Sequence, residues 1–426
     1  MKIAMFTNTY LPHVGGVARS VSTYEDELRS RGHEVRVVAP TFEGAHDSTD
    51  QVLRVSAIQG FNGSDFSVRI PQPGLIASYL DEFRPDVIHS HHPFLLGDAA
   101  LRYAWARRLP LAFTHHTLYE QYTHYVPLDS AALKRVAVQM AVEYCNLCTH
   151  VIAPSESLAA LLAERGVTAP VTVIPTGIDL DFYSSGDRRR FLAEHQIPED
   201  ALVIGHVGRL AGEKNLAFLA RAVRQYLARH ADAVFVVVGD GNECEAFRQA
   251  LLSDTESRQV HLVGKRTGSA LADAYASMDV FVFSSQSETQ GMVLAEAMAA
   301  GAPVVALDGP GVRDVVARDN GRLLPADSTE DQFSQALEEL TSDPRRLRRL
   351  CKTAQASVQE FSIANCADRL ERLYEQLAAA SPRGEGELTP WDRLLGRLEI
   401  EWNLLAEKAS ALAAAVAASE PTRQTP

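Results

Sequence analysis

The stretch Leu202–Leu216 reads LVIGHVGRLAGEKNL and shows the pattern on which the whole chain is built. Its first six residues are mostly apolar and β-branched, which predicts a strand. A glycine-containing loop follows, and a helical stretch begins after it. The same alternation of short β-branched runs with amphipathic helical stretches recurs along the chain and is typical of βαβ units with parallel sheets. The sequence therefore predicts an α/β fold.

The expected strands form two series with the same rhythm but no evident sequence repeat. The first series is Lys2–Phe6, Val35–Ala39, Val87–His89, Leu111–Thr114, His150–Ala153 and Val171–Ile174; the second is Leu202–Val207, Val234–Val238, Val260–Val263, Val280–Phe283 and Val304–Leu307. The segment Ser20–Arg31 predicts a helix that ends at Gly32, because glycine is a usual C-terminal cap.

A segment rich in turn formers, Pro175–Gly186, separates the two series and marks the expected domain boundary. The chain has 426 residues, which suits two or three domains of roughly 150 residues. The expected parts are a first α/β domain at 1–180, a second at 181–362, a crossover helix at 363–377, a linker at 378–387, and an accessory amphipathic helix with a disordered tail at 388–426.

The composition is that of a soluble enzyme and excludes some functions. The formal net charge is −13, and a nucleic-acid binder would instead need clustered lysine and arginine. Five cysteines are too few for a disulfide framework in a chain of this length, so a reducing compartment is expected. Neither a signal peptide nor an apolar run of about 20 residues is evident. We expect a cytoplasmic protein, either free or peripheral at the inner face of the cell membrane.

Two loops that follow strands carry features suited to phosphate. Gly15 and Gly16 precede the first helix, where backbone N–H groups can receive an anion; an ordinary βα turn is the alternative. Arg209 and Lys214 lie on the loop after the strand Leu202–Val207, at the sheet edge where open α/β folds bind ligands. Two cations there suit a diphosphate, whose leaving charge needs stabilising, although a solvated loop remains the alternative.

The stretch Ser287–Pro303 reads SETQGMVLAEAMAAGAP and carries two glutamates eight residues apart. Glu288 follows a strand, and Glu296 lies in the next helix. N–H groups near Gly291 and Met292 could receive phosphate, while the two carboxylates accept hydrogen bonds from sugar hydroxyls. Burial of Glu296 among apolar neighbours would require partners; the alternative places it on the exposed face of the helix.

Taken together, the paired glutamates, the Gly-Arg…Lys loop at 208–214, the Gly-Gly pair and the segment IPTGIDLDFY at 174–183 resemble the retaining glycosyltransferases of family four. The likeness runs from Met1 to about Leu377. Thr114–Val126 together with Ser287–Gly291 resembles the bacterial diacylglycerol α-glucosyltransferases in particular. The sequence departs from the family pattern at Asn242, where relatives often have proline, and in the tail after Leu377.

The resemblance implies a GT-B fold, in which two Rossmann-like domains with parallel sheets face each other across a cleft, here with an extra C-terminal helix. It implies transfer of a hexose, with glucose and a UDP donor favoured over GDP, to a lipid such as diacylglycerol. The implied reaction retains the α configuration and requires no metal.

The resemblance also implies roles for individual residues. Arg209 and Lys214 would neutralise the donor diphosphate, Glu288 would hold the transferred hexose, Glu296 the ribose, and His116 would point toward the reacting sugar. The remaining donor-binding positions are Gly15, Gly16, Gly291, Met292 and Val293.

Several other features have a less specific interpretation. A zinc site among His89, His91, His92, His115, His116 and His124 is conceivable, but their spacing matches no metal motif. Cys145 and Cys148 have no second pair. Asp179 and Asp181 form a D-x-D pattern that we interpret as a turn.

A basic and aromatic pattern in the first domain has two readings. Arg102, Arg107, Arg108, Lys134 and Arg135 alternate with Leu101, Tyr103, Trp105, Leu109 and Leu133. They could dock to anionic lipid through apolar insertion and charge, or they could be solvated helix faces.

Other functions remain open at the level of the sequence. One alternative is a mannosyl- or glucosyltransferase that acts on phosphatidylinositol or on a soluble sugar. Another is a non-hydrolysing nucleotide-sugar epimerase, and a third is a binding-only pseudoenzyme. The donor base, the hexose, the acceptor, the linkage position and the oligomeric state are not determined by these motifs.

Overall fold

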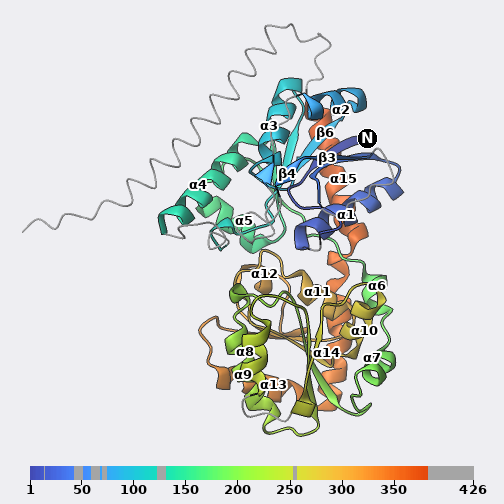
Figure 1. Ribbon diagram of the computed structural model, residues 1–426, viewed down its shortest axis with the longest axis vertical. Coiled ribbons are helices and arrows are strands. Elements are labelled where there is room, and N and C mark those ends of the chain that lie inside the picture. Colours follow the sequence, from blue (N-terminus) through green and yellow to red (C-terminus); the bar gives the residue numbers. More distant parts are fainter. Residues whose placement is uncertain are drawn as a thin grey trace, which may run out of the picture. The chain divides into compact units, whose positions relative to one another are not determined.

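The computed structural model describes residues 1–13, 15–42, 51–58, 68–69, 74–121, 131–252 and 257–381. The described residues divide into two compact units (Figure 1): Met1–Pro175 together with 367–381, and Thr176–Cys366. Part of the predicted linker and the whole accessory helix at 388–426 lie outside the described residues.

The first unit is built on a seven-stranded parallel sheet in the order β3-β2-β1-β6-β7-β8-β9. Its strands are β1 (Lys2–Phe6), β2 (Glu34–Pro40), β3 (Val52–Val55), β6 (Val87–Ser90), β7 (Leu111–Thr114), β8 (His150–Ala153) and β9 (Val171–Val173), and a separate antiparallel pair joins β4 (Ala57–Ile58) to β5 (Val68–Arg69). Its helices are α1 (Gly16–Ser30), α2 (Leu75–Phe83), α3 (Leu96–Arg107), α4 (Ala131–Leu147) and α5 (Glu156–Glu164), with a 3-10 turn, η2, at Tyr119–Gln121.

The second unit is built on a six-stranded parallel sheet in the order β12-β11-β10-β13-β14-β15. Its strands are β10 (Leu202–Val207), β11 (Ala233–Val238), β12 (Val260–Gly264), β13 (Val280–Phe283), β14 (Val304–Leu307) and β15 (Gly321–Leu324). Its helices are α6 (Leu180–Ser184), α7 (Arg188–Glu194), α8 (Leu216–Leu227), α9 (Cys244–Leu252), α10 (Ser269–Ser277), α11 (Met292–Ala299), α12 (Pro310–Arg313), α13 (Glu330–Thr341) and α14 (Pro344–Ser357), with 3-10 turns η4 (Gly212–Lys214), η5 (Ser257–Gln259) and η6 (Val358–Phe361).

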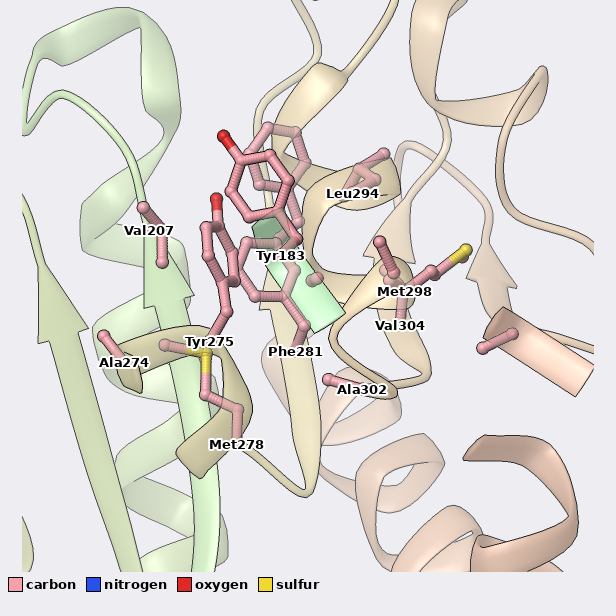
Figure 2. Close-up of a cluster of buried hydrophobic side chains, with 14 of the residues drawn as sticks. Tyr183, Val207, Ala274, Tyr275, Met278, Phe281, Leu294, Met298, Ala302 and Val304 are labelled. Atoms are coloured by element: carbon pink, nitrogen blue, oxygen red, sulfur yellow. The ribbon is translucent and has the colours of Figure 1, made fainter. Parts of the chain in front are cut away.

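Both faces of the second sheet are buried, which explains its continuous apolar strands. Successive residues of a strand point to opposite faces: Phe281 and Phe283 join one core with α6, α7 and α10, whereas Val280 and Val282 join the other with α8 and α13. Figure 2 shows the first of these cores, where Tyr275 packs against Phe281 with ring centroids 6.1 Å apart.

The chain passes from the second unit back to the first within the long helix α15 (Ile363–Ala380), between Cys366 and Ala367. From Ala367 onward the helix packs on the first unit. The Tyr374 hydroxyl lies 2.5 Å from His89 Nδ1, and Arg369 donates to the carbonyl of Val173 at 2.5 Å. Arg31 on α1 forms ion pairs with acidic residues on this helix. These contacts explain why the end of α15 belongs to the first unit.

The predicted α/β fold with two Rossmann-like units is confirmed. Every expected strand is present, and the shifts at the strand ends are one residue or less. Gly32 has a left-handed φ of 86°, as expected of a helix C-terminal cap. Two edge strands, β3 and β15, were not predicted, because an arginine interrupts the short apolar run in each.

In each sheet the strand order reverses direction once, between β1 and β6 in the first unit and between β10 and β13 in the second. Loops at the carboxyl ends of strands diverge at such a switch point, which is where open α/β sheets bind ligands. The loops that carry Gly16, Arg209 and Glu288 follow β1, β10 and β13. The topology therefore places these candidate residues beside the two switch points.

Candidate active site

The loops after β10 and β13 meet through an ion pair. Lys214 Nζ lies 2.5 Å from Glu288 Oε1, and the two side chains are 15% and 18% exposed. The Ser284 hydroxyl donates to the Lys214 carbonyl at 2.9 Å, which holds the cation-bearing turn η4 against the end of β13. A cation and a carboxylate from two different loops are thus joined directly at the switch point of the second sheet.

Glu288 is an ionised carboxylate that is largely shielded from solvent. Burial alone would raise its pKa, but the charge of Lys214 and hydrogen bonds from Lys214 and Ser285 outweigh that effect, so the pKa of Glu288 is lowered from its ordinary value. The carboxylate therefore stays charged at neutral pH and can accept hydrogen bonds.

Arg209 has a different partner. Its guanidinium lies 2.5 Å from Glu213 Oε1, and its side chain is 39% exposed. The partner Glu213, which the sequence did not single out, is nearly buried on η4. Arg209 and Lys214 lie on one short loop, and each is therefore paired with a different carboxylate.

Two glycines after β11 allow that loop to pack tightly on the Arg209 loop. A Cβ on Gly239 would lie 1.9 Å from the carbonyl oxygen of Gly208, and one on Gly241 would lie 2.2 Å from that of Leu210. Side chains at these positions would push the two backbones apart. The glycines therefore fix the position of the loop that carries Arg209.

Gln290 anchors the glutamate-bearing loop, a role that its place in the motif did not reveal. Its side chain is buried, accepts from the Thr176 N–H at 2.7 Å and donates to the Thr176 carbonyl at 2.9 Å. The next residue, Gly291, has a left-handed φ of 71° and caps α11 without a side-chain hydrogen bond. Met292 and Val293 form the first turn of that helix.

Glu296 is buried inside the second unit, so its predicted alternative placement on an exposed helix face is wrong. The Tyr275 hydroxyl donates to Glu296 Oε2 at 2.6 Å. Tyr275 itself is held in the apolar core shown in Figure 2, with Tyr183 packed edge-on at a centroid distance of 5.5 Å. Tyr275 is the partner that burial of this carboxylate required.

In the first unit, Gly15 is the N-cap of α1 and supplies no side-chain cap. A Cβ added to Gly16 would meet no atom within 4 Å. The internal packing of the first unit therefore does not explain a glycine at position 16, and the space beside it is open to a ligand.

His116 belongs to a cluster of histidines at the carboxyl ends of β6 and β7. Its Nε2 lies 3.0 Å from Nδ1 of His91, and the two rings stack with centroids 5.2 Å apart. Burial and neighbouring histidines lower the pKa of both rings well below the ordinary value, so both are neutral at physiological pH. The sequence named His91 only as part of a histidine-rich region and did not indicate this contact.

Comparison with known proteins identifies the chain. The models for Glycosyltransferase Family 4 and for Glycosyl transferases group 1 match residues 14–182 and 201–343. A GDP-mannose-dependent alpha-mannosyltransferase of Mycolicibacterium smegmatis is 32% identical over 353 residues, which are 81% of this chain and 90% of that protein. The chain belongs to glycosyltransferase family 4.

The other similarities agree with this assignment. The alpha-monoglucosyldiacylglycerol synthase of Acholeplasma laidlawii is 26% identical over 395 residues, covering 88% of this glycosyltransferase and 97% of that enzyme. The crystal structure of Anabaena HepE in complex with UDP and glucose superposes with a TM-score of 0.69 at 20% identity, covering 88% of this chain and 100% of that one. The predicted family and GT-B fold are confirmed, and the family assignment supports a glycosyltransferase.

Two of the features that the sequence analysis discounted have structural roles in this glycosyltransferase. Asp179 accepts from the N–H of Phe182 at 2.9 Å and caps α6, so the D-x-D pattern begins a short helix and the predicted turn is wrong. Cys145 and Cys148 are buried free thiols.

His124 lies outside the described residues, and within the described ranges no three His, Cys, Asp or Glu side chains are placed to hold a metal ion.

The structure leaves little of the apolar surface around α3 for the predicted insertion into lipid. Leu101 and Tyr103 are buried, and Trp105 and Leu109 pack against the core of the first unit. Their apolar sides face the sheet because α3 covers it. Arg107 is also engaged, through two hydrogen bonds to Asp81 at 2.9 and 2.6 Å.

At the start of α4, Lys134 and Arg135 are exposed, whereas the side chain of Leu133 lies outside the described part. No helix in the described ranges is both long and apolar enough to cross a bilayer.

Proposed function

We propose that this glycosyltransferase moves a hexose, with glucose favoured, from a nucleotide-sugar donor to a lipid acceptor such as diacylglycerol, with retention of the α configuration. The observation that carries the proposal is the Lys214–Glu288 pair at the switch point of the second sheet. A diphosphate sugar needs a cation at its phosphates and a carboxylate at its hydroxyls, and this pair offers both within one contact.

On the donor side, Arg209 and Lys214 exchange their carboxylate partners for phosphate oxygens when the donor binds. The N–H groups of Gly291, Met292 and Val293 at the start of α11 add donors without a side-chain competitor. These groups stabilise the negative charge that develops on the departing diphosphate. Glu288 holds the transferred hexose, and His116 points toward the reacting sugar.

Glu296 binds the ribose of the donor in this proposal, with Tyr275 fixing its orientation. The hydrogen bond of 2.6 Å from the Tyr275 hydroxyl occupies Oε2 of the carboxylate. A ribose hydroxyl is a donor of the right chemistry for a carboxylate. No side chain in the motifs is an evident covalent nucleophile, so same-face attack assisted by the leaving phosphate is the favoured route to retention.

Gly16 provides a prediction about the first unit. Gly16→Ala should leave the melting temperature unchanged, because a Cβ there meets no atom within 4 Å, while raising the donor KM. Gly16→Val should raise the donor KM further, by roughly 10- to 100-fold, since crowding a close contact with the donor costs about 1–3 kcal/mol. Differential scanning fluorimetry and steady-state kinetics measure the two effects. A valine variant with the parent KM would show that the donor does not approach Gly16.

Metal independence gives a second prediction. Arg209, Lys214 and the start of α11 supply the positive charge in this proposal, so transfer should continue at the parent rate in excess EDTA. The measurement is nucleoside diphosphate release with and without chelator. Loss of activity that Mg²⁺ or Mn²⁺ restores would contradict this and would return Asp179 and Asp181 to consideration as ligands.

A second candidate function is mannosyl transfer from GDP-mannose. The specific observation in its favour is the identity of 32% to an enzyme named GDP-mannose-dependent alpha-mannosyltransferase, against 26% to the Acholeplasma glucosyltransferase. The Acholeplasma enzyme matches over a larger share of both chains than this mannosyltransferase does. The acceptor of the second candidate is phosphatidylinositol or a soluble sugar.

For a lipid acceptor the enzyme must reach a bilayer, and we propose that it docks by local charge in the first unit. The exposed Lys134 and Arg135 at the start of α4 provide it, at roughly 1 kcal/mol per cation on an anionic surface. The cytoplasm and the inner face of the cell membrane are the proposed location. Activity on diacylglycerol should therefore be higher in anionic than in neutral vesicles.

A donor-by-acceptor screen with mass detection tests the proposal. UDP-glucose and GDP-mannose are each combined with diacylglycerol in anionic and neutral vesicles, phosphatidylinositol vesicles and free sugars. The expected product is hexosyl-diacylglycerol from UDP-glucose. Product from GDP-mannose alone would establish the second candidate, and product from free sugars alone would refute the lipid acceptor.

A further inference from the structure

The contact between His91 and His116 determines where each ring carries its proton. Both rings are neutral, so each has one N–H. A hydrogen bond of 3.0 Å between His91 Nδ1 and His116 Nε2 requires one of these nitrogens to be the donor and the other the acceptor. Two arrangements are possible, and they leave different atoms without a partner.

The second nitrogen of His91 distinguishes the arrangements. His91 is 1% exposed, and its Nε2 has no hydrogen-bond partner among the described residues. If His116 were the donor, His91 would carry its proton on this Nε2, as a buried N–H without an acceptor. If His91 is the donor, its Nε2 is only an unused lone pair. Buried unpaired N–H groups are the rarer and costlier case.

We propose that His91 is a positioning residue that fixes the tautomer of His116: His91 Nδ1–H donates to His116 Nε2, and His116 therefore carries its proton on Nδ1. The lone pair of His116 is then occupied. His116 can donate a hydrogen bond from Nδ1 but cannot take up a proton as a general base. The consequence for catalysis rests on the proposed function, in which His116 faces the reacting sugar.

The surrounding structure holds His91 in the orientation that this role requires. Its backbone N–H donates to the carbonyl of Phe6 at 2.9 Å, which ties the end of β6 to β1. Its ring lies against that of His89 at a centroid distance of 4.0 Å. His89 is in turn fixed between Thr114 at 2.7 Å and Tyr374 at 2.5 Å.

The neighbouring His92 has a separate function. Its Nδ1 accepts from the backbone N–H of Asn8 at 3.1 Å, so its proton lies on Nε2. The Asn8 side chain in turn accepts from Leu96 N–H and donates to the Phe94 carbonyl. His92 thus joins the loop after β1 to the loop before α3.

Nuclear magnetic resonance tests the tautomer without any activity measurement. The full-length protein is labelled with ¹⁵N in the histidine rings, and long-range ¹H–¹⁵N spectra are recorded at neutral pH, with His116 assigned by its absence in His116→Gln. The expected spectrum has a protonated Nδ1 and an unprotonated Nε2 for His116. A protonated Nε2 in His116 would overturn the proposal.

Two variants of nearly equal size test whether His91 is the cause. His91→Asn keeps an amide donor near the position of Nδ1, whereas His91→Leu removes it. The Nδ1–H form of His116 should persist in the asparagine variant and be replaced, at least in part, by the Nε2–H form in the leucine variant. An unchanged His116 spectrum in the leucine variant would overturn the proposal. If that variant does not fold, the parent and asparagine spectra decide.

Kinetics then separate the two proposals. Loss of one hydrogen bond predicts a kcat about tenfold lower for His91→Leu, with the donor KM nearly unchanged and kcat largely restored in His91→Asn. A leucine variant with altered tautomer but parent kcat would refute the catalytic part of this inference. Parent kcat in His116→Gln would refute the role of His116 in the proposed function and leave the tautomer assignment standing.

Discussion

Lys214→Ala is expected to lower kcat by roughly 10²- to 10³-fold, the usual effect of removing one preorganised group that stabilises developing negative charge. Lys214 is the better placed of the two cations, because its side chain is 15% exposed and held at 2.5 Å from Glu288, whereas that of Arg209 is 39% exposed. We expect Arg209→Ala to be impaired less severely. Initial rates of nucleoside diphosphate release, measured in the presence of acceptor, provide the test.

The matched control for this variant is Lys352→Ala. Lys352 is an exposed lysine on α14 and belongs to neither the loop after β10 nor the loop after β13. Its replacement removes the same charge from the chain and should leave kcat unchanged. If Lys214→Ala keeps the turnover of this control while remaining folded, Lys214 does not stabilise the leaving group.

Glu288→Gln is the second substitution with a large expected effect, a fall in kcat/KM of roughly 10- to 100-fold. Glutamine has nearly the same shape but forms weaker hydrogen bonds to sugar hydroxyls, and a hydrogen bond to a charged group contributes about 1.5–3 kcal/mol. The substitution also leaves Lys214 without its carboxylate partner. Steady-state kinetics with saturating acceptor measure the effect, and a kcat/KM within threefold of the parent would contradict the assignment.

A double-mutant cycle extends this prediction to the pair. Because Lys214 and Glu288 are in direct contact, the loss of transition-state stabilisation in the double variant should be smaller than the sum of the losses in Lys214→Ala and Glu288→Gln. Additive effects would mean that the two residues act independently.

The same pair affects acid stability. The pKa of Glu288 lies below its ordinary value, so the stabilisation it provides is complete above the unfolded-state pKa and is lost as the pH falls through the lowered value. Near neutral pH the parent and Glu288→Gln should therefore have the same pH dependence of stability.

Central strands were predictable because their own residues carry the signal. Lys2–Phe6, Leu111–Thr114 and Leu202–Val207 are apolar runs bounded by polar or turn residues, and their observed limits match those expected. The edge strand β15 carries less of that signal, since one of its sides has no partner strand and a charged residue is tolerated there.

The candidate site was only partly predictable, because its contacts join residues far apart in the chain. Spacing placed Lys214 and Glu288 on separate loops, but their ion pair across 74 positions depends on β10 and β13 being neighbours. The anchoring of Thr176 by Gln290 spans 114 positions in the same way. The sequence around α3 showed an alternation of basic and apolar residues, but not that the apolar side faces the sheet.

The anomeric configuration of the product tests the central claim most directly. The purified enzyme is incubated with UDP-glucose and diacylglycerol in anionic vesicles, and the isolated glycolipid is examined by proton NMR. The account predicts glucosyl-diacylglycerol whose anomeric proton shows the α linkage of the donor. A β-linked product would contradict retention, and the absence of any glycolipid beside an active transfer to a soluble sugar would contradict the lipid acceptor.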